Sequence, residues 1–476
     1  MNALLNRLLA DPKSRQLLNR AASWIIIALA AFLRLWNLGY PNKLVFDETY
    51  YVKDAWTLWN TGAEKAWPNN ANAAFESGHV FDYLNEPSFV VHPPLGKWIM
   101  GFGMWLFGAQ NSFSWRISVA VLSIAAVALI MMIAKILFQT KIWSLVAGFL
   151  FAIDGHAIVL GRTGLLDGIL MFFVLLAFYF LLRHLQTGIN LERATWRQPW
   201  LIAVGVTLGA ASAVKWSGLY FLAAFGLYLV ISDVLNRRKY WLSAIQALIT
   251  FTLMVPVAII TYLATWTGWL VTSKGYDRDS NPNPFLALLK YHQDAFNFHV
   301  NLHTPHNYAS NPATWLFAIR PTSFFYESQT LGQDGCASAD GCSSAITALG
   351  NPFIWLPAAA AVIFLTYLFF TRHSKVGGLI LLGIAGGYLP WLAFMNRTVF
   401  QFYSIAFLPW MILALVYVLR LYLHTRDTAE LPRAVRLVGG YLGLTFVASL
   451  FFLPIWIGTW TPYWYWHIHM WIPSWI

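Results

Sequence analysis

Charged residues are scarce in this 476-residue sequence, in which Asp, Glu, Lys and Arg together make up 11 % of the chain. A soluble globule of this length needs a charged surface, yet 58 % of the residues are hydrophobic and 25 are Trp. The shortage of charge therefore excludes a water-soluble globular protein and indicates an integral membrane protein. Because lipid offers no partner for backbone polar groups, the apolar runs are predicted to be helices.

Cysteine is nearly absent as well. The only two cysteines, Cys336 and Cys342, lie in the Gly-rich stretch "GQDGCASADGC". We predict that they form a disulfide in an oxidising compartment, with a pair of free thiols as the alternative. Two thiols without a second pair or a nearby His cannot supply the four ligands of a structural zinc site. No metal site and no cofactor is predicted, and a dependence on a divalent metal is left open.

Acidic residues are fewer than basic ones, and the formal net charge is +11. The excess does not point to a nucleic-acid partner, because the basic residues fall in short clusters between apolar runs, as they do in cytoplasmic loops of membrane proteins. The clusters that favour a cytoplasmic N-terminus are Arg7, Lys13, Arg15 and Arg20; Lys135 and Lys141; Arg183, Arg193 and Arg197; Arg237, Arg238 and Lys239; Arg372 and Lys375; and Arg420, Arg426, Arg433 and Arg436.

Long apolar runs are what the sequence has in abundance. About eleven of them approach the roughly 20 residues that cross a hydrocarbon core of ~30 Å. They are residues 22–40, 116–138, 142–155, 165–183, 199–215, 218–234, 241–268, 351–371, 376–395, 402–420 and 437–457. An odd number of crossings places the C-terminus outside. Residues 94–109 are apolar but short, and we predict that they lie in the outer interface or re-enter from outside, because a further crossing would invert every later loop.

The predicted fold is therefore an all-α polytopic bundle that forms one integral-membrane domain over residues 1–476. Two long external segments interrupt it. Residues 41–115 are rich in Trp, Tyr and Asn and are expected to form interfacial helices, whereas residues 269–350 contain several turn signals. Neither segment is long enough to indicate an independent domain, and both are expected to fold over the bundle as lids.

Ionisable and other polar side chains gather at the predicted outer face, where they are costly unless they meet protein, water or a ligand. Asp47 and Glu48 follow the first apolar run in "LVFDETYYVKDAW". The other members of this group are His92, Lys97, Arg116, Asp154, His156, Arg162, Asp167, His299, His303, His306, Asn396, Arg397 and Gln401.

Each of these positions also has a plainer interpretation. A single cation at a helix end, such as Lys43 or Lys290, is usually an interfacial anchor, and the histidines can be surface residues. The acids Asp47 and Glu48 can be a solvated helix start.

Anchoring does not, however, require several loops to bring both signs of charge to one membrane face. Arg and Lys at headgroup depth suit a phosphate, and a nearby carboxylate can act as a general base. Together they indicate group transfer from a lipid phosphate to a hydroxyl.

With these residues in view, the sequence resembles the protein O-mannosyltransferase family of GT-C glycosyltransferases, in particular its bacterial, actinobacterial-type members. The matching stretches, spread over residues 45–403, are "VFDETYYVKDAW", "VVHPPLGKW", "WRISVAVLS", "GRTGLLDG", "HTPHNYASNPATW" and "NRTVFQFY". The resemblance implies a GT-C-type bundle that transfers one mannose from polyprenyl-phosphate-mannose to Ser or Thr hydroxyls of secreted or membrane proteins. It implies an inverting direct displacement with Asp47 as the base and Glu48 as its acidic neighbour.

The resemblance and the charge pattern together give candidate residues for the other roles. Those for the donor phosphate and sugar are His92, Lys97, Arg116, Arg162, Asp167 and Arg397. Those for acceptor binding or for a lid are Asp154, His303, His306, Asn396 and Gln401. Eukaryotic members of the family carry a β-trefoil insert for which residues 269–350 are too short, which supports a bacterial plasma-membrane enzyme. The protein-translocation machinery is a further candidate partner.

Two alternatives stay open at this point. A GT-C enzyme that transfers a sugar from a polyprenyl phosphate to a lipid or glycan would present the same outer-face residues. A transporter or flippase is disfavoured, because such proteins place ionisable residues near the bilayer midplane and often show internal repeats, whereas this sequence has neither.

Overall fold

A helical bundle forms the body of the computed structural model, which describes residues 11–188, 190, 192–237 and 239–476. Within these ranges, eight helical segments are long and apolar enough to cross a membrane. They are α2 (Pro12–Leu35), α6 (Ser112–Phe138), α9 (Leu166–Gln186), α11 (Gly218–Asn236), α12 (Tyr240–Thr265), α15 (Pro352–Arg372), α16 (Lys375–Gly387) extended by η4 (Leu389–Phe394), and α18 (Leu431–Phe452).

Three shorter apolar helices complete the bundle, namely α7 (Lys141–Ile153), α10 (Pro199–Val214) and α17 (Leu408–His424). Helices therefore occur at the positions of the predicted apolar runs, while the number of eleven crossings stays a prediction because these three are short. Arg7 and Arg238, two of the residues behind the predicted orientation, lie outside the described part of the chain.

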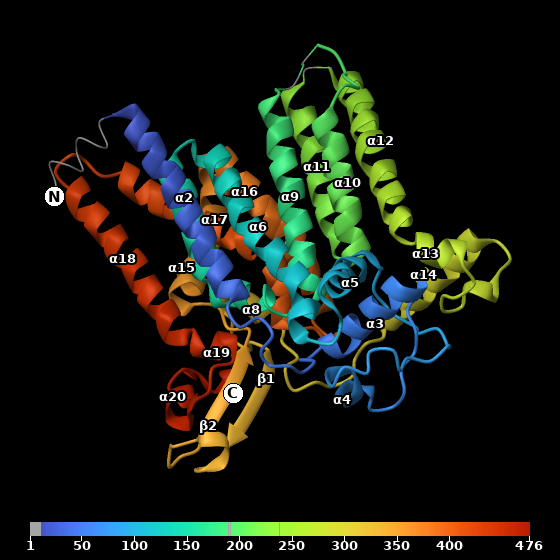
Figure 1. The fold of residues 1–476 in the computed structure, drawn as a ribbon. Coiled ribbons are helices and arrows are strands. Elements are labelled where there is room, and N and C mark those ends of the chain that lie inside the picture. The colour runs from blue at the N-terminus through green and yellow to red at the C-terminus, as the bar shows by residue number, and fades with distance from the viewer. Residues whose placement is uncertain (1–10, 189, 191, 238) are drawn as a thin grey trace.

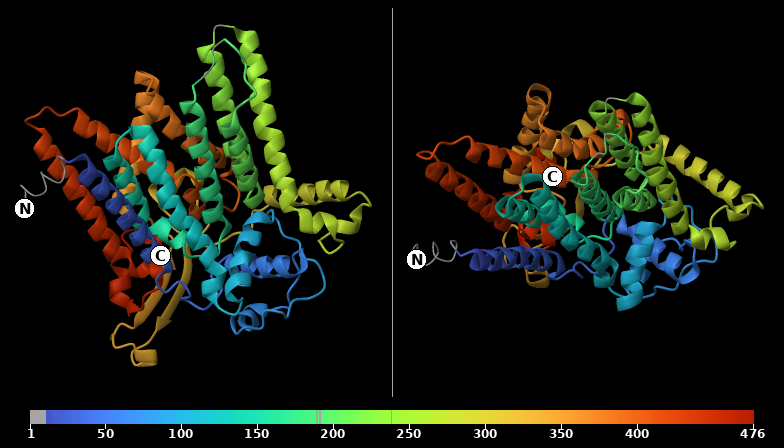
Figure 2. Two further views of the ribbon diagram at one scale, coloured as in Figure 1. Left: turned by 45° about the horizontal axis from the view of Figure 1, so that its top comes forward. Right: turned by 90° about the horizontal axis from the view of Figure 1, so that it is seen from above.

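The two ends of the bundle differ in what they carry. Figure 1 shows the start of α2 at the same end as the starts of α10 and α12, whereas the C-terminus lies at the opposite end. That opposite end carries the elements of both long segments, which Figure 2 shows from two further directions. They are α3 (Glu48–Thr61), α4 (Ala71–Glu76), α5 (Leu95–Phe107), α13 (Thr267–Val271), η1 (Arg278–Ser280), α14 (Pro284–Val300), η2 (Pro312–Phe317), β1 (Ser323–Gln329), η3 (Gln333–Gly335) and β2 (Cys342–Thr347). We call it the loop-rich end.

The remaining short elements also lie between or after the bundle helices. They are α8 (Gly155–Leu160), η5 (Gln401–Ala406), α19 (Pro454–Ile457), β3 (Thr461–Pro462), α20 (Tyr463–His467) and η6 (Pro473–Trp475). Helix α5, from the run that was predicted to lie in the interface, packs against α3 and α6 and is not among the apolar helices named above. This arrangement fits an interfacial position.

A small antiparallel sheet accompanies the bundle and was not indicated by the sequence. Its strand order is β1-β2-β3, with Gln329 opposite Cys342 and Cys342 opposite Pro462. Cys336 and Cys342 are joined by a disulfide in this hairpin. The body of the chain is helical as predicted, whereas β1 and β2 belong to the second long segment and β3 lies near the C-terminus.

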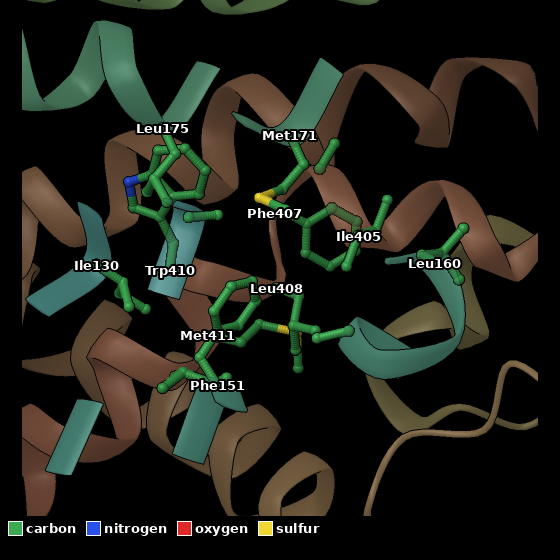
Figure 3. Close-up of a cluster of buried hydrophobic side chains, with 14 of the residues drawn as sticks. Ile130, Phe151, Leu160, Met171, Leu175, Ile405, Phe407, Leu408, Trp410 and Met411 are labelled. Atoms are coloured by element: carbon green, nitrogen blue, oxygen red, sulfur yellow. The ribbon is translucent and has the colours of Figure 1, made fainter. Parts of the chain in front are cut away.

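The core sits where α6, α7, α9 and α17 meet. Figure 3 shows side chains from these helices and from η5 packed against one another, with Trp410 beside Leu175 and Phe407 near Ile405. A Cβ on Gly383 would lie 2.1 Å from ring atoms of Trp410, so only glycine allows α16 to approach this closely. The packing fixes α9, whose first turn carries Asp167, and it fixes α17, which directly follows the η5 segment that carries Tyr403.

Candidate active site

Asp47 stands at the start of α3, at the loop-rich end of the bundle. It occupies the N-cap position, but its side chain makes no capping hydrogen bond with the helix. The half-buried carboxylate is instead close enough to Lys215, Asp167 and the Tyr51 side chain for these groups to act on its pKa. Burial raises the pKa of Asp47 to about 6, with a further increase from Asp167, while Lys215 and Tyr51 oppose the rise. Such a carboxylate is ionised at pH 7 and more basic than an ordinary Asp.

Glu48, the neighbouring acid, has no free oxygen to offer. Its carboxylate receives Nε and Nη2 of Arg116, each at 2.8 Å, in a fully buried bidentate pair. It also accepts hydrogen bonds from the backbone N–H groups of Val45 and Gly164 at 3.0 and 2.6 Å. Glu48 therefore joins the start of α3 to α6 and to the segment before α9.

Arg116 is equally committed to protein partners. Its Nη1 donates to the carbonyl oxygens of Leu38 and Pro41, at 3.2 and 3.0 Å, and its Nη2 donates to that of Lys43 at 2.9 Å. With the two bonds to Glu48 these contacts use all the N–H donors of a guanidinium. Arg116 thus holds the loop that precedes Asp47 and has no donor left for a ligand.

A second buried ion pair lies beside Asp47. Nζ of Lys215 is 3.0 Å from both carboxylate oxygens of Asp167 and lies 4.3 Å from the centroid of the Tyr403 ring. Lys215 follows α10, Asp167 is in the first turn of α9 and Tyr403 belongs to η5. The pair consequently fixes one cation at the meeting point of three elements, next to the half-buried carboxylate.

Lys215 also lines a small pocket of about 120 Å³. Residues His92, Trp216, Tyr220, Phe296, His299, Trp391, Arg397 and Tyr403 line it as well. We call this cavity the cationic pocket. Nη2 of Arg397 donates to Nδ1 of His299 at 2.9 Å, whereas its buried Nε has no hydrogen-bond partner among the described residues. Arg397 therefore has N–H donors that a ligand in the pocket can use.

The two histidines of the cationic pocket are neutral at pH 7. Burial, and after it the charge of Arg397, together lower the pKa of His299 to about 4. Burial also places the pKa of His92 well below its usual value, and the charge of Lys215 adds to this effect. Their ring centroids are 5.1 Å apart, and Nε2 of His299 is bonded to the carbonyl oxygen of Val91 at 3.0 Å. Both ring nitrogens of His299 are therefore engaged with protein groups, and the neutral imidazole of His92 is the one that can bond to an uncharged hydroxyl, such as that of a sugar.

An apolar groove adjoins the cationic pocket. Its volume is about 740 Å³, and it runs between α11, α12 and α14. Trp216 and Phe296 line both cavities, so the groove and the pocket are adjacent. Leu219, Leu222, Ile259 and Leu263 supply most of the apolar wall. A cationic pocket beside an apolar groove suits a molecule with an anionic head and a hydrocarbon tail.

The predicted candidates separate into two groups. The structure brings Asp47, Asp167, His92 and Arg397 together at the cationic pocket or beside it. Lys97 is instead buried in an ion pair with Glu64 and donates to the carbonyl oxygen of His92 at 3.2 Å. Lys97 thus lies behind the wall of the pocket.

Arg162 and Asp154 also bind protein groups. Arg162 donates to carbonyl oxygens at the end of α2, those of Leu33, Arg34, Trp36 and Asn37. Asp154 caps α8 by accepting from the backbone N–H of Ala157, and it accepts from the N–H of Asn351 and from Nε1 of Trp355. His156 bonds to the carbonyl oxygen of Ala348 through Nδ1. These contacts connect helices, and they give Arg162, Asp154 and His156 a structural role instead of a role in ligand binding.

The candidates for an acceptor site or lid lie on segments that touch one another. His303 is bonded through Nδ1 to the carbonyl oxygen of Asn396 at 2.9 Å. The exposed His306 packs its ring against those of Phe46 and Phe400. Gln401 is buried and donates to Oγ of Ser404 at 3.3 Å. Through its contact with Phe46, the residue before Asp47, His306 is the member of this group that is linked most directly to Asp47.

Several residues of the site were missed by the sequence interpretation, namely Tyr51, Glu64, Lys215, Trp216, Tyr220 and Tyr403. A signal for Lys215 did exist. It is a charged residue at the outer end of the apolar run 199–215, which is the criterion that selected the other candidates. The tyrosines gave no comparable signal because the sequence holds 21 of them. In the described ranges no group of three or more His, Cys, Asp or Glu side chains could hold a metal ion.

Solved structures share this architecture. The Saccharomyces cerevisiae protein O-mannosyltransferase Pmt1-Pmt2 complex bound to the sugar donor has a chain that matches with a TM-score of 0.76 and 15 % identity, over 96 % of this chain and 92 % of that one. ArnT from Cupriavidus metallidurans, bound to undecaprenyl phosphate, matches with a TM-score of 0.50 and 15 % identity, over 93 % and 71 % of the two chains. The fold is that of the GT-C class of polytopic membrane glycosyltransferases.

Sequence comparison narrows the class to a family. Residues 92–272 match the family model described as dolichyl-phosphate-mannose-protein mannosyltransferase, and residues 285–475 match the C-terminal four TMM region of protein-O-mannosyltransferase. The polyprenol-phosphate-mannose–protein mannosyltransferase of Mycolicibacterium smegmatis is 30 % identical over 96 % of this chain and 94 % of its own length. The chain belongs to the protein O-mannosyltransferase family and is a glycosyltransferase.

Proposed function

We propose that this enzyme transfers one mannose from polyprenyl-phosphate-mannose to Ser or Thr hydroxyls of secreted or membrane proteins. The names of the relatives supply the donor and the protein acceptor. The observation that carries the proposal here is the half-buried carboxylate of Asp47 beside a cationic pocket that adjoins an apolar groove. In this arrangement the polyprenyl tail lies in the groove and the phosphate lies near Arg397 and Lys215.

The reaction we propose is a single displacement with one base. Asp47 accepts the proton of the acceptor hydroxyl, whose oxygen bonds to the anomeric carbon of mannose. The bond from that carbon to the phosphate oxygen breaks, and the electron pair stays on the polyprenyl phosphate. Arg397 and Lys215 offset the negative charge on the leaving phosphate, so no covalent sugar–enzyme intermediate is needed. The configuration at the anomeric carbon is thereby inverted.

The remaining candidates receive supporting roles in this proposal. Glu48 and Arg116 position the loop that bears Asp47, because each of their polar groups is bonded to protein. Lys97 positions the backbone of His92, and Arg162 holds the end of α2. Asp167 orients Lys215. We further propose that the loop-rich end faces the outside of the plasma membrane, where acceptors emerge from the translocation machinery.

The test uses the purified enzyme in lipid nanodiscs, polyprenyl-phosphate-[¹⁴C]mannose and a peptide with a single Thr. Label is expected to enter the peptide. Replacing Asp47 by Asn should lower kcat by about 10²- to 10⁴-fold, the range that a general base contributes, and should leave donor binding intact. The matched control is Asp82→Asn, which changes an exposed carboxylate of the same external segment. Normal turnover in Asp47→Asn would reject the role of Asp47. Label in lipid or glycan but not in peptide would favour the alternative acceptor class.

A further inference from the structure

Strand β1 has an open edge. In the sheet order β1-β2-β3, strand β2 is central and β1 is paired on one side. Within the described residues, the outer edge of β1 forms no backbone hydrogen bond with another segment. The strand itself is held on both faces, because Phe325 packs against Tyr40 and Tyr326 packs against Trp466. A seven-residue edge with unpaired N–H and C=O groups is a template for a further strand, which proteins usually cover.

The open edge begins next to Asp47. Phe324 of β1 and Phe46 have ring centroids 5.3 Å apart, and Phe46 directly precedes Asp47 in the chain. Phe46 has φ +50°, a left-handed conformation that an aromatic residue rarely adopts. The rings of Phe400 and Phe402, at 5.3 and 5.6 Å, hold it in this conformation. The surrounding aromatic cluster therefore fixes the start of β1 relative to the carboxylate.

The aromatic cluster also separates β1 from the cationic pocket. Tyr403 lines the pocket, and its ring lies 4.9 Å from that of Phe402, which in turn contacts Phe46 and Phe324. Figure 1 shows the β1–β2 hairpin below α8, whereas α14, which lines the pocket, lies at the right beside α12. In a direct displacement the nucleophile approaches the sugar from the face opposite the leaving phosphate. The acceptor hydroxyl must then arrive from the side of Asp47 on which β1 lies.

We propose that the acceptor polypeptide binds in extended form as an additional strand on the outer edge of β1, with its Ser or Thr reaching Asp47 at the start of the strand. This inference rests on the proposed transfer to protein acceptors. Strand addition obtains its affinity from main-chain hydrogen bonds, which every polypeptide can form. The edge therefore selects an extended, unfolded acceptor and discriminates little between acceptor sequences.

The decisive experiment is an N-methyl scan of the acceptor peptide, assayed with the unaltered full-length enzyme and labelled donor. In a strand, successive N–H groups point to opposite sides, so only every second one can pair with β1. N-methylation at alternate positions should raise KM for the peptide by about tenfold, as expected for loss of one hydrogen bond together with a steric clash. Methylation at the intervening positions should leave KM unchanged, and the affinity for the donor should not change with any peptide.

The outcomes separate this inference from the proposed function. If the unmethylated peptide accepts no mannose, the proposed function fails. If it accepts mannose but the methylated peptides show no alternation, strand addition is rejected while the function stands.

Cross-linking gives a second measurement on the enzyme itself. Ser328 is exposed on β1, and Ala339 is exposed in the turn that follows it. An acceptor peptide whose Cys carries a thiopyridyl group should form a disulfide with the Ser328→Cys variant by exchange, with release of thiopyridone, and an excess of plain acceptor should suppress this reaction. The matched control, Ala339→Cys, should react more slowly and without competition. Equal, uncompeted reaction of both variants would overturn the proposal.

Discussion

At the scale of single residues, the neighbours Asp47 and Glu48 show how differently two acids can be surrounded. Glu48 is enclosed by Arg116 and two backbone N–H groups. Asp47 makes no capping bond and faces Lys215 across a half-buried space. The first arrangement fixes the loop, and the second leaves a carboxylate able to accept a proton. The proposed division of roles follows from these contacts.

The arginines provide a first prediction. Arg397→Ala should raise the Kd for polyprenyl-phosphate-mannose by about 10- to 100-fold, because a charge-assisted hydrogen bond contributes about 1.5–3 kcal/mol. Arg116→Ala should instead lower the free energy of unfolding by about 3–5 kcal/mol, because it leaves Glu48 buried without its partner. Donor titration and denaturant unfolding followed by Trp fluorescence would measure the two effects. Unchanged donor affinity in a folded Arg397→Ala enzyme would remove that residue from the phosphate site.

The pH dependence of the reaction provides a second prediction. The pKa of Asp47 is raised from 3.8 to about 6, mainly by burial. A general base must be unprotonated, so kcat/KM for the peptide should be level above pH 6 and fall about tenfold per pH unit below it. The matched control is Asp54→Asn, because burial raises the pKa of Asp54 to about 7 and this group lies near Lys97 and Glu64. The acid limb should persist near pH 6 in that variant. Its disappearance would assign the limb to Asp54 instead.

The sequence could indicate which residues face the loop-rich end but not which of them are free to bind a ligand. Arg116, Arg162 and Arg397 all lie at ends of apolar runs and look alike in the sequence. The difference between them is made by backbone carbonyl oxygens at Leu38, Pro41 and the end of α2, which bind the first two. Such contacts depend on how loops fold back, and no local pattern encodes them.

At the scale of elements, the groove between α11, α12 and α14 has one wall that can be tested directly. Ile259 lines the groove, whereas its neighbour Ile260 is more exposed and does not line it. Both lie in α12, so substitution of either by Asn places a polar group on the same helix at nearly the same depth.

We expect Ile259→Asn to raise KM for the long-chain donor, because a polar group would then meet the buried hydrocarbon tail. It should leave KM unchanged for an analogue whose short lipid does not reach α12. Ile260→Asn should affect neither donor. The measurement is KM of each variant for the long-chain donor and for the short-lipid analogue. Equal KM values of the two variants for the long-chain donor would show that the lipid tail does not lie in this groove.

The sequence predicted the bundle helices but not strand β1, and the difference has a physical reason. The bundle helices follow from long apolar runs, which lipid forces into helical structure whatever their neighbours are. Strand β1 has no such constraint, because "SFFYESQ" is short, carries a bulge and alternates only in part. It becomes a strand through pairing with β2, to which the Cys336–Cys342 disulfide is attached, and through packing against Tyr40 and Trp466.

At the scale of the whole molecule, the two ends of the bundle are expected to face different compartments. The basic clusters predict that the connection between α17 and α18 is cytoplasmic and that the loop-rich end is external. Asn85 lies between α4 and α5 at the loop-rich end, and Thr428 lies in the connection between α17 and α18. Both are exposed, and the native cysteines are joined in a disulfide.

These facts allow a labelling test. In intact cells a membrane-impermeant maleimide should label the Asn85→Cys variant and leave Thr428→Cys unlabelled until the cells are permeabilised. Labelling of Thr428→Cys alone in intact cells would reverse the orientation. In that case the active site would face the cytoplasm, and translocated proteins could not be its acceptors.

The fixed order of Asp47 and Glu48 has a consequence for comparing relatives. Exchanging the two acids would preserve composition, isoelectric point and hydropathy. It would nevertheless replace the shorter, proton-accepting side chain by a longer one and give Arg116 a partner one methylene too short. We therefore expect the exchange of these two acids to inactivate the enzyme although it changes no bulk property of the sequence. Whether a relative has Asp before Glu at these positions is then a better indication of activity than its overall percentage identity.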